Sequence, residues 1–99
     1  MSLREDQSTF VLKVSLLIQY AYSIGYELTF GDAYATTGHV YDSFHYQRLA
    51  IDLNLFKDGK YLTKTSDHEL LGNFWESIGG TWGGRFDSPD GNHYSYKEY

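Results

Sequence analysis

The segment RLAIDLNLF, residues 48–56, constrains this chain most strongly because its apolar and polar positions alternate. A period of two is typical of a β-strand that buries one face. The polar face carries Arg48 and Asp52, so the acid is expected outside the core. The apolar face has four aliphatic side chains, which are Leu49, Ile51, Leu53 and Leu55.

The segments around this strand predict a hairpin and two helices. KDGK follows it, and Asp58-Gly59 is a typical hairpin centre, so YLT is expected to return as a strand. Residues 7–24 have apolar side chains at three- and four-residue steps, which predicts a helix with Ser8 as N-cap and Gly25 as its end. A second helix is expected to open with a capping box from Ser66 to Glu69 and to run to about Ile78.

The remaining segments complete an α+β pattern. YELTFGDAY and HYSYKEY read as strands, and GGTWGGRFDSPDGN reads as a long glycine-rich loop. The order of helix, strands, helix and strand predicts a small antiparallel sheet with helices packed on one side. With 99 residues, we expect one domain over 1–99 and a monomer.

Composition narrows the classes of function. The net charge is -5 and basic residues are not clustered, which argues against a nucleic-acid-binding protein. The absence of cysteine excludes disulfides and thiolate zinc ligands. The first ten residues do not read as a secretion signal, and polar residues interrupt the apolar stretch 9–26, so neither export nor membrane insertion is expected.

Three side chains are candidate metal ligands, namely His45, Asp52 and His93, because histidine and aspartate are good zinc ligands. Two ligands seven residues apart require the chain to reverse between them. The alternative is a set of unrelated polar groups, with Asp52 paired to a nearby cation. Asp90 precedes His93 closely and is a candidate general base, although Asp87 competes for the role and PDGN is also a favourable turn. His68, in the first turn of the second helix, is expected at the surface.

Two blocks resemble a known peptidase family. SFHYQRLAIDLNLF is similar to the signature S-x-H-x-x-G-x-A-x-D, with Ser43, His45, Ala50 and Asp52 in register. GGTWGGRFDSPDGNHYSY resembles the family's C-terminal segment, in which a Trp/Gly-rich loop leads to an acid and then a histidine. The family comprises zinc peptidases, including D-alanyl-D-alanine carboxypeptidases, D-Ala-D-Ala dipeptidases and phage L-alanyl-D-glutamate endolysins.

The resemblance implies a zinc ion held by His45, Asp52 and His93, with Asp90 as the general base. Peptidoglycan stem peptides would be the substrate, and Ser43, Trp82 and Arg85 would contact it. An alternative for Trp82 is ordinary core packing. The family pattern carries an arginine where this chain has Ala35. Arg48, on the same strand face as Asp52, is the first candidate to replace it, and Arg85 is the second.

The expected activity is hydrolysis of the L-Ala–D-Glu bond by a phage endolysin. Such an enzyme would be made in the host cytoplasm and would reach the cell wall through a holin. A D-Ala-D-Ala carboxypeptidase is the second possibility. The third is a virion protein that binds wall peptides but turns them over poorly, because it has Ala35 in place of the family's arginine.

Overall fold

The N-terminal helix α1 spans Leu3–Ser23 and begins earlier than predicted. A computed structural model of the chain describes residues 2–33 and 47–97. Ser2, not Ser8, caps the helix, because the Ser2 hydroxyl accepts from the backbone N–H of Glu5 at 3.2 Å and the Glu5 carboxylate accepts from the N–H of Ser2 at 3.1 Å. The helix buries its predicted apolar face, which includes Phe10, Val14, Leu17 and Ala21.

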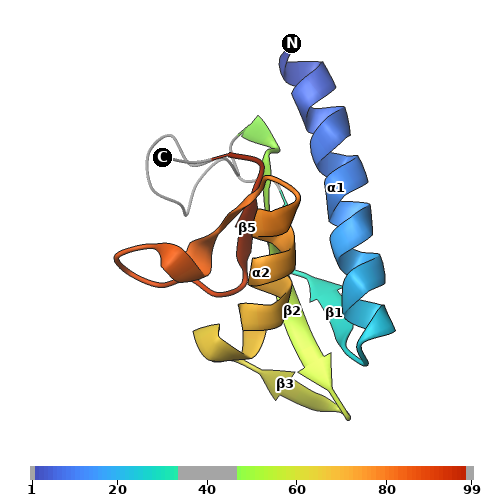
Figure 1. Cartoon of the computed structure of the whole chain (residues 1–99), viewed down its shortest axis with the longest axis vertical. Helices are drawn as coiled ribbons and strands as arrows, with labels where there is room; N and C mark the ends of the chain where they lie inside the picture. The colour runs from blue at the N-terminus through green and yellow to red at the C-terminus, as the bar shows by residue number, and fades with distance from the viewer. Residues whose placement is uncertain (1, 34–46, 98–99) are drawn as a thin grey trace.

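Strand β2 (Ala50–Lys57) lies at the centre of an antiparallel sheet, as the alternation predicted. The sheet order is β1-β2-β5-β4, and β3 also pairs with β2 (Figure 1). β5 pairs with the first half of β2, and β3 pairs with its second half. The bounds of the other strands are Glu27–Phe30 for β1, Lys60–Leu62 for β3, Thr81–Trp82 for β4 and His93–Ser95 for β5.

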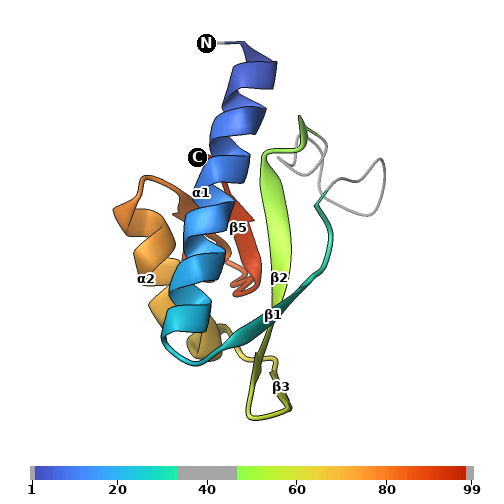
Figure 2. The ribbon, with the colours of Figure 1, turned by 90° about the vertical axis from the view of Figure 1, so that its right-hand side faces the viewer.

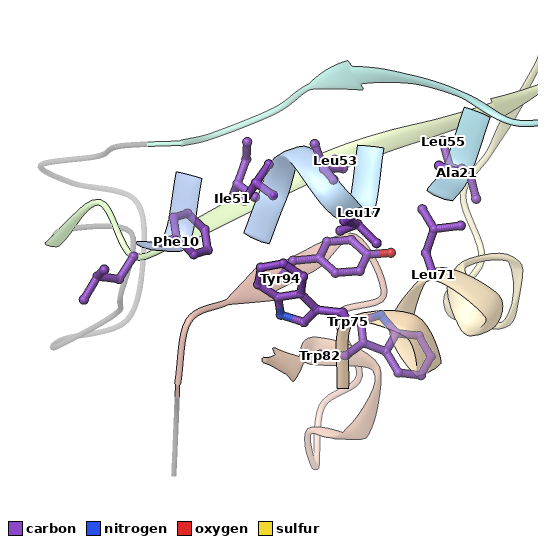
Figure 3. Close-up of a cluster of buried hydrophobic side chains, with 12 residues drawn as sticks. Phe10, Leu17, Ala21, Ile51, Leu53, Leu55, Leu71, Trp75, Trp82 and Tyr94 are labelled. Atoms are coloured by element: carbon purple, nitrogen blue, oxygen red, sulfur yellow. The ribbon is translucent and has the colours of Figure 1, made fainter. Parts of the chain in front are cut away.

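Both α1 and α2 (Glu69–Ser77) lie on the same side of β2, which leaves the other face of the strand without a helix in the described part of the chain (Figure 2). The aliphatic face of β2 packs against these helices, and aromatic side chains from α2, β4 and β5 complete the core (Figure 3). The buried aromatic residues are Phe10, Trp75, Trp82 and Tyr94. The predicted α+β class, with helices on one side of a small antiparallel sheet, is confirmed.

The turn between β2 and β3 has the predicted chemistry. Asp58 and Gly59 have φ values of 52° and 78°, so both central residues are in the left-handed region. A type I′ turn requires this at both positions, and its twist matches that of the paired strands.

Two further local predictions were wrong. The glycine-rich segment is not a plain loop, because it contains β4 and a 3₁₀ turn over Gly83–Arg85. The capping box from Ser66 to Glu69 is replaced by a 3₁₀ turn over Thr65–His68, in which the N–H of Lys64 donates to the Asp67 carboxylate at 3.0 Å. Among the described residues, no helix combines the length and apolar character needed to cross a bilayer.

Candidate metal and catalytic site

Asp52 and His93 are directly opposite each other in the β2–β5 ladder. Their side chains point away from the helices, because the neighbours on either side of Asp52 are buried on the core face and Tyr94 is buried beside His93. His93 Nδ1 lies 3.6 Å from Asp52 Oδ1. His93 is only 5% exposed, whereas Asp52 is half-buried. The acid in the strand therefore belongs to a polar pair on the open face of the sheet.

Asp90 joins this pair from the loop before β5. Its backbone N–H donates to the Gly83 carbonyl at 2.9 Å, and its own carbonyl accepts from the N–H of His93 at 3.2 Å. One potential ligand atom from each of Asp52, Asp90 and His93 lies within 4.8 Å of the others. Asp90 is exposed, so water can reach its carboxylate.

This donor set suits a zinc ion. Carboxylate oxygens and an imidazole nitrogen bind zinc at about 2.0–2.2 Å, so ligand atoms around a tetrahedral ion lie about 3.3 Å apart. His93 Nδ1 and Asp52 Oδ1 lie 3.6 Å apart, which is close to that spacing, so these two residues fit one zinc ion.

The end of β1 fixes the backbone of Asp52 from the other edge. Gly31 N–H donates to the Asp52 carbonyl at 2.7 Å, and Asp52 N–H donates to the Asp32 carbonyl at 2.8 Å. Two consecutive residues therefore face one residue of β2, which is the pattern of a β-bulge. A Cβ added at Gly31 would lie 3.1 Å from Asp52 Cβ. The glycine inside YELTFGDAY was the available sequence signal for this contact.

Arg48 does not share a strand face with Asp52, contrary to the prediction. β2 begins at Ala50, and Arg48 precedes it with φ 58°. This left-handed residue interrupts the alternation, so the period of two does not extend back to position 48. Arg48 lines a cavity of about 400 Å³ together with Phe10 and Ile51, which belong to the helix side of the sheet.

Trp82 is a core residue, which favours the alternative of ordinary core packing over a contact with substrate. It is 2% exposed, and its indole N–H donates to the Gly91 carbonyl at 2.7 Å. A buried indole needs such an acceptor, which accounts for its inward position.

Arg85 is held against α2. Its guanidinium pairs with Glu76 at 3.1 Å, donates to Asn73 at 2.8 Å and lies 5.0 Å from the Trp82 ring centroid. The predicted contact of Arg85 with substrate is not supported by any of these partners.

His68 is buried rather than exposed, contrary to the prediction. It is 2% exposed, and its Nδ1 forms a 2.8 Å hydrogen bond with the Tyr94 hydroxyl. The 3₁₀ turn before α2 directs the ring inward, which the helical interpretation of the segment could not reveal. Burial lowers the pKa of His68 to about 4 and raises the pKa of the Tyr94 hydroxyl.

Ser43, His45 and the Ala35 position lie outside the described residues. Their predicted roles therefore remain predictions. Residues 36–96, more than half of the chain, match the family model described as D-alanyl-D-alanine carboxypeptidase. This range includes Asp52, Asp90 and His93. No curated protein matches the chain significantly.

Proposed function

This chain belongs to the D-alanyl-D-alanine carboxypeptidase family, and we propose that it is a zinc-dependent peptidase that hydrolyses a stem-peptide bond of bacterial peptidoglycan. The observation that carries the proposal is the meeting of Asp52, Asp90 and His93 on the open face of the sheet. These residues come from one strand, one loop and a second strand, and the family match includes all three.

Asp52 and His93 would hold the ion together with His45. When bound, zinc supplies a Lewis acid that polarises the scissile carbonyl and lowers the pKa of a water molecule toward 7. The β2–β5 register fixes the two described ligands relative to each other before any ion binds. Because the sheet backbone is already ordered, little of the binding free energy would be spent on arranging them.

Asp90 would act as the general base. Its carboxylate is exposed at the rim of the cluster, where it can accept a proton from the attacking water. The same carboxyl group can then donate that proton to the leaving amine as the peptide bond breaks. This assignment leaves Asp52 and His93, which are less exposed, to act as ligands.

Recognition of the substrate carboxylate is the weaker part of the site. Position 35 is alanine, Arg48 lines a cavity on the helix side, and Arg85 is paired with Glu76. These observations favour a second candidate function, in which the protein binds wall peptides and turns them over slowly. Metal binding is common to both functions, so only turnover distinguishes them.

We propose the L-Ala–D-Glu bond as the first target, on the similarity of the sequence to phage endolysins. The D-Ala-D-Ala bond is the alternative, and the description of the matching family supports it. The phage role would place synthesis in the host cytoplasm and action at the cell wall after release by a holin.

Mass spectrometry of purified peptidoglycan incubated with the zinc-loaded protein tests the proposal. New L-Ala carboxyl and D-Glu amino termini would identify the endopeptidase, whereas released D-Ala would identify the carboxypeptidase. Either product must disappear with a zinc chelator and with Asp90→Asn. Zinc-loaded protein that binds several wall types without forming products would support the binding function instead.

A further inference from the structure

The loop that carries Asp90 is closed at its neck by two adjacent hydrogen bonds. The indole N–H of Trp82 donates to the Gly91 carbonyl at 2.7 Å, and the N–H of Asp90 donates to the Gly83 carbonyl at 2.9 Å. These bonds join neighbouring residues on each side, 82 and 83 on one and 90 and 91 on the other. The backbone position of Asp90 is therefore set by the neck of the loop.

The Trp82 indole is tightly packed. A Cβ at Gly72 of α2, or at Gly84 of the 3₁₀ turn, would overlap the indole ring. The Arg85 guanidinium lies 5.0 Å from the ring centroid and is itself anchored to Glu76 at 3.1 Å. The ring is thus confined by α2 and by its own turn, and its N–H has a fixed direction.

The neck also brings the Asp90 loop against His93. A Cβ at Gly83 would overlap the Asp90 carbonyl and would lie 2.8 Å from His93 Cβ. Glycine at this position permits the close approach. The backbone contacts of the loop at Gly83 therefore help to place the Asp90 carboxylate beside His93.

We propose that Trp82 is a positioning residue for Asp90, an inference that rests on the proposed function. The packed indole donates its hydrogen bond to the Gly91 carbonyl and so keeps the neck of the loop closed. The closed neck keeps the Asp90 carboxylate beside Asp52 and His93. Removing the N–H opens the neck at one of its two hydrogen bonds. The general base then spends less time in its working position, while the metal ligands on β2 and β5 stay in place.

Trp82→Phe removes the N–H, and Trp75→Phe is a matched control. Trp75 is also fully buried and also donates its indole N–H to a backbone carbonyl, that of Ser95, at 2.9 Å. It anchors the other end of β5 and does not touch the Asp90 loop in the described contacts. We would measure hydrogen exchange of individual backbone amides by NMR, zinc content, kcat and KM for all three proteins.

We expect the Asp90 amide to exchange at least about tenfold faster in Trp82→Phe than in the wild type, and kcat to fall by about tenfold or more with KM and zinc content unchanged. Trp75→Phe should leave Asp90 exchange and kcat near wild type. Unchanged Asp90 exchange in Trp82→Phe, or equal effects of the two variants, would overturn the inference. If Trp82→Phe does not fold, a synthetic chain with benzothienylalanine at 82 keeps both rings, removes only the N–H and is held to the same outcomes.

The exchange measurement needs no turnover. If the wild-type protein cuts no wall peptide, the proposed function is contradicted. The amide exchange data would still decide whether Trp82 holds the Asp90 loop. Conversely, an active wild type with unaltered Asp90 exchange in Trp82→Phe would remove only the role of Trp82.

Discussion

Asp52 and His93 face each other across the β2–β5 ladder, with His93 Nδ1 3.6 Å from Asp52 Oδ1. A histidine and a carboxylate at a paired position of an antiparallel sheet have Cβ atoms about 5 Å apart, which suits two ligands of one ion. The register of β2 and β5 therefore places the two side chains together. Each residue of the cluster can be replaced and tested separately.

Replacing His93 by alanine should remove zinc. Loss of a hydrogen-bond partner behind a metal ligand costs about 10–100-fold in metal affinity, so loss of the ligand itself should cost more than about 100-fold. Zinc per chain after gel filtration, measured by mass spectrometry of the metal, checks this. His68→Ala is the control, because His68 is equally buried but bonds to Tyr94 outside the cluster. A His93→Ala protein that keeps one zinc per chain would exclude His93 from the site.

Replacing Asp90 by asparagine should keep both fold and zinc but lower kcat by about 10²–10⁴-fold, because the amide cannot accept the proton of the attacking water. Steady-state kinetics on purified peptidoglycan fragments provide the measurement. Asp87→Asn is the matched control, since Asp87 is an exposed acid of the same loop. If Asp87→Asn shows the loss instead, Asp87 is the base.

Zinc should stabilise the folded chain, because the unfolded chain does not hold the ligands together. At free zinc 100-fold above Kd, the free energy of unfolding rises by about 2.7 kcal/mol. For a domain of this size the Tm should rise by more than about 5 °C. Thermal unfolding with zinc and with a chelator gives the comparison. Identical Tm values in the two conditions, at saturating zinc, would contradict a metal site.

Gly31→Ala should weaken zinc binding several-fold. The new Cβ lies 3.1 Å from Asp52 Cβ and 3.2 Å from the Asp52 carbonyl oxygen, so Asp52 must shift by a few tenths of an ångström. Gly59→Ala is the control, because that position is strained at φ 78° but open in space. It should lose about 1 kcal/mol of stability with no change in zinc affinity. Calorimetric titration measures the zinc affinity of both variants. Equal zinc affinities of Gly31→Ala and the wild type would show that Gly31 does not support the site.

His68 should make the metal-free protein less stable in mild acid. Burial lowers its pKa from 6.5 to about 4, so between these pH values the unfolded chain binds a proton that the folded chain does not. The free energy of unfolding should therefore decrease as pH falls from about 6.5 to 4, by up to about 1.4 kcal/mol per pH unit from this group. Below about pH 4 both states are protonated and the contribution becomes constant.

Urea titrations of wild type and His68→Gln at pH 7 and pH 5, both with chelator, isolate this contribution. All other titratable groups are the same in the two proteins, so the difference between their changes in unfolding free energy from pH 7 to pH 5 belongs to His68. Equal changes in unfolding free energy would show that the His68 ring takes up its proton in the folded state as readily as in the unfolded one.

Most of the sheet could be predicted from sequence because period-two alternation and a two-residue turn are local signals. The faces of β2 and the Asp58-Gly59 turn are of this kind. The position of Arg48 could not be predicted, since a single left-handed residue ends the alternation without a sign in the hydrophobic pattern. Residue chemistry and the family resemblance together selected Asp52, Asp90 and His93, which the structure brings together.

The interior position of Trp82 depends on two glycines that leave room for its ring. Gly72 lies in α2, ten residues earlier, and Gly84 lies in the 3₁₀ turn that follows Trp82. A glycine-rich segment is typical of a loop, and no periodicity marks which aromatic side chain those glycines accommodate. His68 was misplaced for a similar reason, because helix-start residues predict an exposed first turn and the 3₁₀ geometry changes the direction of the side chain.

The alternation of β2 has a consequence for how this enzyme can evolve. Each core residue of the strand is the immediate neighbour of a position on the open face, so a one-residue shift of β2 would exchange its two faces and lose the core and the metal cluster together. The exposed tip of the Asp90 loop, including Ser88 and Pro89, has no such coupling to the core. Insertions and deletions should therefore be tolerated mainly at that tip, whereas one residue inserted into β2 or deleted from it should disrupt both the core and the metal cluster.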